Sequence, residues 1–336
     1  MTSILLILIG LVLLVWSADK LIEGASALAR NLGVSPLIIG LTIVGFGTSA
    51  PEMVVSAIAS LKNTPELAVG NAIGSNIANI ALILGITALL YPLKVESGTL
   101  KREFPVLILV TAITWVFISD FRIDRSDGVL FIFLLIAITG WLTILGLNGS
   151  KNDPLSKEFS DEIPANLSTN KAVFWLVVGI VLLPISSNML VTGATHIARL
   201  YGISDAIIGL TVVALGTSLP ELAAAITGAI KKEDDLAMGN IIGSNMFNLL
   251  GVLGIAGIIT PTNFGTYLLY RDYATMALVT VVLYALAYGF SRRGKLGRRA
   301  GLILLVIYFS YEAMLYHNTF NQQQGRTQKI TVEVSS

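Results

Sequence analysis

The chain has 336 residues, of which 54% are hydrophobic and 13% charged, against roughly 25% charged residues in an ordinary globular domain. This composition and a mean hydropathy of +0.78 exclude a soluble protein and predict an integral membrane protein. The 22 Lys and Arg balance 21 Asp and Glu, and Cys is absent, so we expect no nucleic-acid partner, no disulfide and no Cys-based metal site.

Ten apolar windows are long enough, or nearly so, for the roughly 20 residues of a membrane-spanning helix. They cover residues 1–18, 31–61, 67–93, 104–119, 128–150, 172–198, 206–230, 236–270, 273–291 and 300–311. No Lys or Arg precedes the first window, so we expect a retained span rather than a cleaved signal peptide. The sequence therefore predicts an all-α membrane protein with ten transmembrane helices.

The two halves of the chain repeat each other. Residues 40–86 and 209–255 align without a gap at an offset of 169, with 22 identities in 47 positions. Each half holds five spans, an odd number, so the second copy must enter the membrane from the opposite side. We predict two inverted five-helix repeats, residues 1–146 and 172–316. A polar cytoplasmic linker, residues 147–171, joins them, and we expect the polar tail, residues 317–336, to be disordered.

The loop charges predict the orientation in the membrane. With the N-terminus outside, 14 Lys and Arg fall in inner loops and 7 in outer loops. Positive loops stay on the cytoplasmic side, so we expect both termini outside in a multi-pass protein of the cell (inner, cytoplasmic) membrane.

Asp19, Lys20 and Glu23 follow the first apolar run, and we interpret them as an interfacial or interhelical ion pair.

The second and seventh spans each contain a Gly-Thr-Ser-x-Pro-Glu motif, ending at Glu52 and at Glu221. Gly and Pro predict a break in both helices near the bilayer centre. Each motif also fits a capping box, in which Ser caps a helix and Glu reaches back. A carboxylate at the centre of a membrane helix costs about 2.5 to 3.5 kcal/mol on insertion scales, so two at equivalent positions indicate a bound cation.

The third and eighth spans each add a Gly-Asn-x-Ile-Gly-Ser-Asn-x-x-Asn motif. Its polar residues recur every four positions and so share one helix face: Asn71, Ser75 and Asn79, repeated as Asn240, Ser244 and Asn248. The alternative is that the motif serves helix packing alone. That alternative applies most to Gly70, Gly74, Gly239, Gly243, Asn76 and Asn245.

Together the two copies offer two carboxylates, several hydroxyl and amide oxygens and loosened main-chain carbonyls. Ca²⁺ takes six to eight oxygen ligands, and Na⁺ is similarly hard. A transition metal would be expected to recruit His or Cys, and none lies near these motifs. The residues thus predict a site for a hard cation.

These paired motifs resemble the two α-repeats of the cation/Ca²⁺ exchanger superfamily, most closely the compact prokaryotic calcium/sodium antiporters. The resemblance implies a secondary antiporter, not an enzyme, that exchanges Ca²⁺ for Na⁺ by alternating access at a midplane site. It implies Ca²⁺ and Na⁺ as substrates, no cofactor, the lipid bilayer as surroundings and no obligatory protein partner. The ligands that it implies are Thr48, Ser49, Glu52, Ser75, Asn79, Thr217, Ser218, Glu221, Ser244 and Asn248.

Asn248 departs from relatives that carry Asp at this position, including the K⁺-dependent branch, and argues mildly against K⁺ co-transport.

An H⁺/Ca²⁺ exchanger is the leading alternative, because no sequence feature identifies the counter-ion. A cation channel is a second alternative, since rings of carboxylates also select cations. A hydrolase with the two Glu as an acid/base pair would give no reason for two whole inverted copies.

Overall fold

The computed structural model describes residues 2–63, 65–95, 101–149, 167–201, 214–288 and 294–335. Within these residues, eight helices are long and apolar enough to cross a membrane, and two further apolar helices, Glu103–Phe117 and Leu219–Ile230, are shorter. Most of the predicted linker lies outside the described residues. So does the first part of the seventh predicted span.

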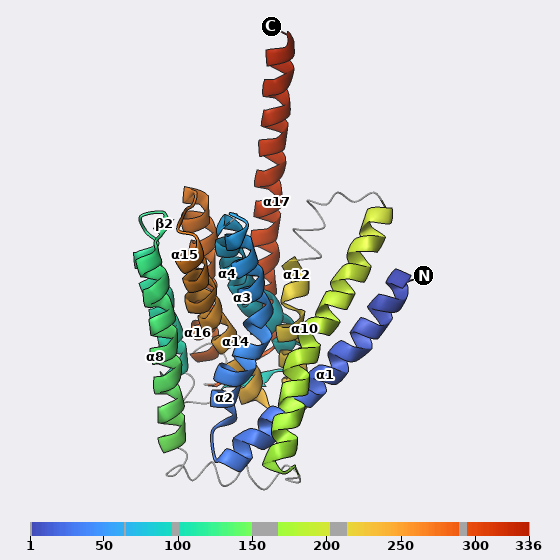
Figure 1. Ribbon diagram of the computed structural model, residues 1–336, viewed down its shortest axis with the longest axis vertical. Coiled ribbons are helices and arrows are strands. Elements are labelled where there is room, and N and C mark those ends of the chain that lie inside the picture. Colours follow the sequence, from blue (N-terminus) through green and yellow to red (C-terminus); the bar gives the residue numbers. More distant parts are fainter. Residues whose placement is uncertain are drawn as a thin grey trace.

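The helices follow one another through both halves of the chain (Figure 1), and η marks π-helical turns. The first half contains α1 (Thr2–Leu32), α2 (Pro36–Ile39), η1 (Gly40–Val44), α3 (Gly45–Leu61), α4 (Pro65–Ile77), η2 (Ala78–Ile83), α5 (Leu84–Leu90), α7 (Glu103–Phe117) and α8 (Arg125–Gly149). The second half contains α10 (Thr169–Leu200), α12 (Ala214–Thr217), α13 (Leu219–Ile230), α14 (Asp234–Met246), η5 (Phe247–Val252), α15 (Leu253–Ile259), η6 (Leu268–Tyr273), α16 (Ala274–Tyr288) and α17 (Arg298–Ser335).

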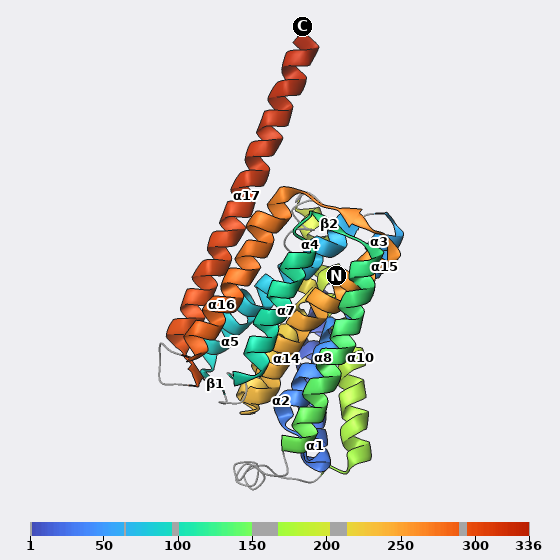
Figure 2. The same cartoon turned by 90° about the vertical axis from the view of Figure 1, so that its left-hand side faces the viewer.

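Two short antiparallel strand pairs connect the halves at opposite ends of the helices (Figure 2). β1 (Leu93–Lys94) pairs with β4 (Lys295–Leu296), and β2 (Arg122–Ile123) pairs with β3 (Thr262–Asn263). β1 and β3 occupy equivalent positions of the sequence repeat, 169 residues apart. Equivalent segments of the two halves therefore lie at opposite ends of the molecule.

α1 and α10 lie side by side at one edge of the bundle (Figure 1) and pack closely through glycines. A Cβ atom added at Gly24 would lie 2.5 Å from the main-chain nitrogen of Leu176. One added at Gly193 would lie 2.8 Å from a side-chain carbon of Ile7. Gly193 is the repeat equivalent of Gly24, and Leu176 that of Ile7, so the same contact recurs with the halves exchanged.

Glycines also let η1 of the first half approach α14 of the second. A Cβ atom at Gly243 would lie 2.1 Å from the carbonyl oxygen of Leu41, and Gly239 is similarly crowded. These two glycines therefore serve the close packing that the sequence predicts. For Gly70 and Gly74, no atom of the described residues lies within 4 Å of an added Cβ, so these two glycines do not serve close packing within the described part of the chain.

The C-terminal tail corrects one prediction. We expected disorder after Tyr316, whereas α17 continues as a helix to Ser335 and extends beyond the other helices (Figure 1). The segment contains no Pro and is rich in polar residues with good helix propensity, such as Gln. Once a helix has been nucleated in the preceding apolar segment, adding further turns costs little.

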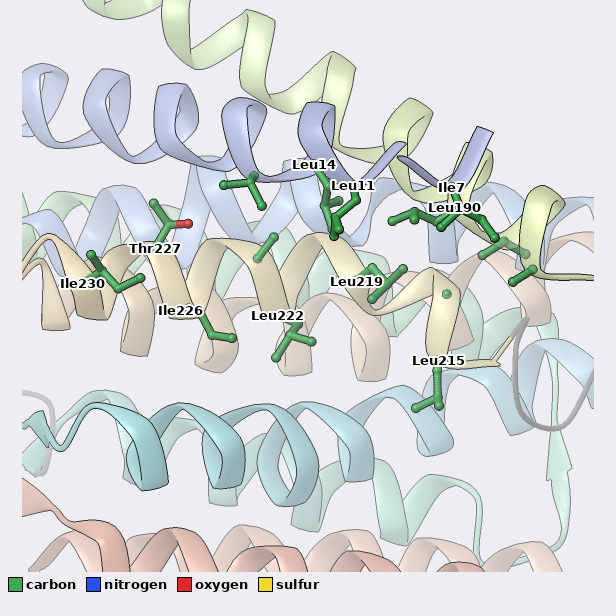
Figure 3. A pocket seen from close by; sticks show the side chains of 15 residues that line it. Ile7, Leu11, Leu14, Leu190, Leu215, Leu219, Leu222, Ile226, Thr227 and Ile230 are labelled. Carbon is green, nitrogen blue, oxygen red and sulfur yellow. The ribbon is translucent and has the colours of Figure 1, made fainter. Parts of the chain in front are cut away.

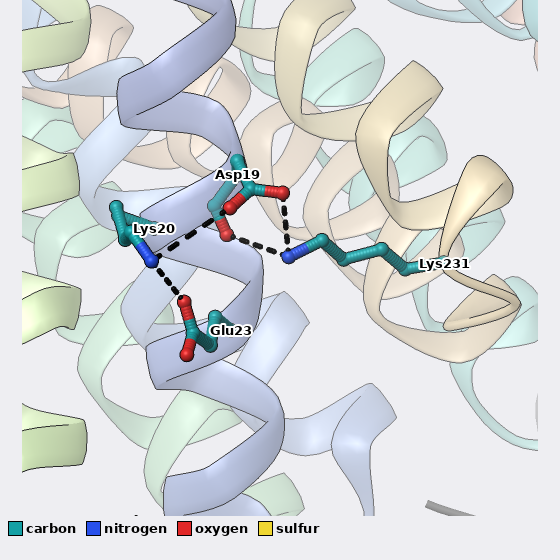
Figure 4. A network of polar contacts seen from close by, with 4 residues as sticks. All are labelled: Asp19, Lys20, Glu23 and Lys231. Carbon is teal, nitrogen blue, oxygen red and sulfur yellow. Dashed lines mark hydrogen bonds and ion pairs between the residues drawn. The ribbon is translucent and has the colours of Figure 1, made fainter.

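The charged residues at the middle of α1 form the expected ion pairs (Figure 4). Lys20 Nζ lies 2.6 Å from Glu23 Oε2 within α1. Asp19 instead contacts the second half, because its Oδ1 lies 2.7 Å from Nζ of Lys231 at the end of α13. Lys231 also donates to the main-chain oxygen of Asp19 at 3.1 Å. These contacts hold the end of α13 against α1.

Candidate ion-binding site

The two Gly-Thr-Ser-x-Pro-Glu motifs fold differently. In the seventh span the helix is interrupted at Ser218 (φ −91°, ψ 4°), between α12 and α13, as the sequence predicts. In the second span α3 continues from Gly45 to Leu61 with Pro51 inside it, so the predicted break there is wrong. Pro51 removes one main-chain hydrogen bond, but contacts with α4, α14 and η5 hold both parts of α3 in line.

The break at Ser218 gives Glu221 a favourable position. Pro220 lies in the first turn of α13, where its missing N–H costs nothing. Glu221 is in the same turn, where free N–H groups and the helix dipole stabilise a negative charge. Ser218 occupies the N-cap position but makes no capping hydrogen bond with its side chain. A capping box therefore does not explain this Ser and Glu.

π-Helical turns modify the polar faces of the third and eighth spans. η2 begins one residue before Asn79, and η5 begins one residue before Asn248. The two π-helical turns occupy equivalent positions of the repeat. A π-helical turn contains an extra residue, so the prediction of one uninterrupted α-helical face ends at these asparagines. Such turns occur frequently at functional sites.

Hydroxyl groups of α3 contact the second half of the chain. Thr48 Oγ1 donates to Asn240 Oδ1 at 2.9 Å and lies 3.2 Å from Ser244 Oγ. Ser49 Oγ donates to Glu221 Oε1 at 3.4 Å. All five side chains are at most 1% exposed. The polar residues of α3, α13 and α14 thus form one buried cluster between the two halves.

Glu221 belongs to this cluster, and Glu52 lies near Glu221. Each is 1% exposed, and they are close enough for their negative charges to repel each other. Within the described part of the chain, Oε2 of each glutamate has no hydrogen-bond partner. No Lys or Arg of the described residues forms an ion pair with either carboxylate. This pair of carboxylates has the charge to attract a cation.

Asparagines of the third and eighth spans form two equivalent hydrogen bonds. Asn79 Nδ2 donates to Asn245 Oδ1 at 3.1 Å, and Asn248 Nδ2 donates to Asn76 Oδ1 at 3.1 Å. Each bond is the repeat equivalent of the other with the halves exchanged. η5, which carries Asn248, contacts α3, and η2, which carries Asn79, contacts α13. The asparagines therefore lie on elements that pack against both glutamate-bearing helices.

Five buried side-chain oxygens of predicted ligands find no hydrogen-bond partner among the described residues. They are Glu52 Oε2, Glu221 Oε2, Asn79 Oδ1, Asn248 Oδ1 and Ser218 Oγ. Buried polar atoms are nearly always paired, so five on one set of predicted ligands require an explanation. Coordination of a hard cation by oxygen supplies it. The described residues contain no group of three or more His, Cys, Asp or Glu suited to a metal.

The remaining predicted ligands are less closely linked. Ser75 in α4 is buried but forms no hydrogen bond through its side chain to the other predicted ligands within the described chain. Thr217, in α12, is half-buried beside Ser218. Conversely, Asn240, Asn76 and Asn245 contribute contacts that the ligand prediction omitted. Each of these positions is Asn in both copies of the repeat, and this signal could have identified them as site residues.

Comparison with known proteins agrees with this geometry. The family described as "Sodium/calcium exchanger protein" matches residues 2–144 and 171–316. CaxA of Alkalimonas amylolytica is 46% identical over 94% of this chain and 99% of its own. The inner membrane protein YrbG of Escherichia coli (strain K12) is 42% identical, over 93% and 96%.

Among solved structures, the sodium-calcium exchanger NCX_Mj, soaked with zero Na⁺ and Ca²⁺, is similar with a TM-score of 0.80 and 30% identity. The match covers 94% of this chain and 99% of that one. The matched family and this structure indicate Ca²⁺ exchange rather than enzymatic activity. This chain is a multi-pass integral membrane protein and belongs to the sodium/calcium exchanger family.

Proposed function

We propose that this protein exchanges Ca²⁺ for Na⁺ by alternating access, with the ions bound near the bilayer centre between its two halves. The observation that carries the proposal is a set of five buried oxygen atoms without a hydrogen-bond partner among the described residues. The two glutamates, Asn79, Asn248 and Ser218 contribute one oxygen each. The proposed ligands are Thr48, Ser49, Glu52, Ser75, Asn79, Thr217, Ser218, Glu221, Ser244 and Asn248.

The charge of the site explains why exchange would be obligatory. Two ionised carboxylates that are 1% exposed are costly to enclose without counter-charge. One Ca²⁺, or two or more Na⁺, neutralises them. Only the loaded forms would then change access from one side of the membrane to the other. A channel has no such requirement.

Na⁺ is the proposed counter-ion, because both the family and the similar structure carry it in their names. H⁺ is the alternative, since protons can neutralise the same two carboxylates. Asn248 cannot ionise, so it adds no third charge for K⁺ to neutralise. We therefore propose K⁺-independent exchange.

The proposed architecture is ten spans in two inverted repeats, residues 1–146 and 172–316, with linker 147–171, tail 317–336 and both termini outside. Contacts that recur with the halves exchanged support a twofold relation between the repeats. The opposite ends occupied by β1 and β3 support the inversion. The two short helices, α7 and α13, would complete the set of ten spans.

Uptake of radioactive Ca²⁺ into proteoliposomes tests the coupling. Vesicles are loaded with Na⁺, with K⁺ or with a buffer that creates a pH step, one at a time. We expect uptake only from Na⁺-loaded vesicles. Uptake driven by the pH step alone would establish H⁺ as the counter-ion, and uptake without any trans-side ion would identify a channel.

A further inference from the structure

An apolar crevice lies between α1, α10 and the α12–α13 segment (Figure 3). Its volume is about 530 Å³. Leu11 and Leu14 of α1 and Leu190 of α10 line one side of the crevice. A row of α13 side chains, from Leu219 to Ile230, lines the other side. Thr227 carries the one polar side chain of this lining. None of the residues of the carboxylate cluster lines the crevice.

The crevice is open at the outer surface of the helix bundle, where a membrane protein meets lipid. Four lining residues, Leu11, Val15, Leu215 and Ile230, are between 41% and 60% exposed. Water does not suit this space, because a buried water needs two to four polar partners, and Thr227 alone among the lining residues offers a polar side chain. An empty space would forfeit the dispersion contacts of its lining. Hydrocarbon chains are therefore the fitting occupants.

The length of the crevice corresponds to one leaflet. From Leu219 to Ile230 the axis of α13 rises about 17 Å at 1.5 Å per residue, close to half of the roughly 30 Å hydrocarbon thickness. The crevice also reaches Gly216, so its inner end touches both sides of the turn at Ser218. An occupant would thus contact the helix break that bears a proposed ion ligand.

The other end of the crevice carries charge. Lys231 and Lys232 follow Ile230, the last residue of α13, and Lys231 is held by Asp19 of α1 (Figure 4). Lys232 is exposed, and its ammonium group forms no ion pair within the described part of the chain. The repeat equivalent of Lys232 is Asn63, which is neutral. A free cation at the headgroup level attracts a phosphate.

We propose that this crevice binds one acyl chain of a membrane phospholipid from the leaflet at which α13 ends, with its anionic headgroup at Lys232. The apolar lining holds the chain, and the lysine favours a negatively charged headgroup over a zwitterionic one. The bilayer itself supplies the lipid.

Photo-crosslinking in proteoliposomes tests the site. The probe is phosphatidylglycerol that carries a diazirine on one acyl chain, and adducts are mapped by peptide mass spectrometry. We expect adducts on α1 and α13 at several-fold higher yield than on α8, whose exposed apolar face (Val129, Phe133, Ile136) belongs to no part of this crevice. Equal yields on all exposed apolar faces would overturn the proposal.

Two variants with matched controls separate the chain from the headgroup. Ala223→Leu fills the crevice and should lower the yield on α13 several-fold, whereas Val54→Leu, at the equivalent position of α3, should not. Lys232→Asn should reduce labelling by the phosphatidylglycerol probe to that by a phosphatidylcholine probe, whereas Lys295→Asn should not. Unchanged labelling of Ala223→Leu would refute the chain site, and equal labelling of wild type by both probes would refute the headgroup contact.

Discussion

Asn248 donates a hydrogen bond from Nδ2 to Oδ1 of Asn76 at 3.1 Å, and its own Oδ1 is buried without a partner among the described residues. The bond fixes the orientation of the Asn248 amide. Its nitrogen holds the two halves together, and its oxygen remains available as an ion ligand. Asn79 repeats the arrangement with Asn245. An amide provides both functions, whereas a carboxylate cannot donate the hydrogen bond.

Replacing Asn248 with Asp should therefore change both the charge and the geometry of the site. A third carboxylate needs further positive charge, so we expect Ca²⁺ flux with a steeper pH dependence and with stimulation by K⁺. Acid should inhibit wild type as well, because protons compete with cations for Glu52 and Glu221. The measurement is Na⁺-driven flux from about pH 5 to 9, with and without K⁺.

Asn31→Asp is the control for this substitution. Asn31 lies near the end of α1, is exposed and donates to the main-chain oxygen of Leu167 at 3.0 Å, so a charge there should leave the K⁺ response unchanged. Identical pH and K⁺ profiles for wild type and Asn248→Asp would mean that Asn248 does not face the ions.

Glu52→Gln and Glu221→Gln should each reduce Ca²⁺ exchange to background. Each substitution keeps the shape of the side chain but removes a charge that the divalent ion needs. Flux in proteoliposomes measures the effect, and monodisperse purification checks the fold. Glu103→Gln removes a carboxylate that is equally buried but pairs with Arg102, and it should exchange Ca²⁺ normally. Near wild-type exchange in either site variant would disprove the site assignment.

The sequence predicted the elements of this fold better than their details. Apolar windows and the 169-residue offset located the helices, because membrane spans require long apolar segments. The continuity of α3 through Pro51 was not predictable, since it depends on packing against α4, α14 and η5. The π-helical turns beside Asn79 and Asn248 likewise have no single-residue signal.

The candidate site was predictable for a different reason. Carboxylates within membrane-spanning segments are costly, so Glu52 and Glu221, at equivalent positions of two apolar windows, already indicated a cation. The role of Asn240 was harder to predict, because it depends on a hydrogen bond from Thr48, which lies in the other half of the chain. Sequence spacing gives a helix face but not the contacts between two helices. The structure supplies these contacts.

Gly243→Ala should destabilise the protein. A Cβ atom there would lie 2.1 Å from the Leu41 carbonyl oxygen, and overpacking of this kind costs roughly 1 to 3 kcal/mol. Thermal unfolding in detergent measures the change. Gly140→Ala is the control, because no atom of the described residues lies within 4 Å of its added Cβ. Ala there should be neutral or stabilise the helix by about 0.5 to 1 kcal/mol. A Gly243→Ala variant as stable as wild type would contradict the close approach of η1 and α14.

Cysteine labelling tests the inverted topology. The protein contains no Cys, so single-cysteine variants need no altered background. Lys62 follows α3 and Lys231 follows α13, and the two are repeat equivalents. In intact cells an impermeant thiol reagent should label Lys62→Cys directly, but Lys231→Cys only after permeabilisation. Opposite sides are expected because the proposed architecture gives each half five spans.

A neighbouring pair provides the check on this measurement. Lys231 forms an ion pair with Asp19, so its replacement disturbs a contact between the halves. Asn63 and Lys232, the next equivalent residues, are both exposed and share a left-handed backbone with φ of 58° and 61°. Cysteines there should show the same opposite labelling as the first pair. If both members of either pair were labelled from the same side, the halves could not be inverted, and alternating access around a twofold site would lose its structural basis.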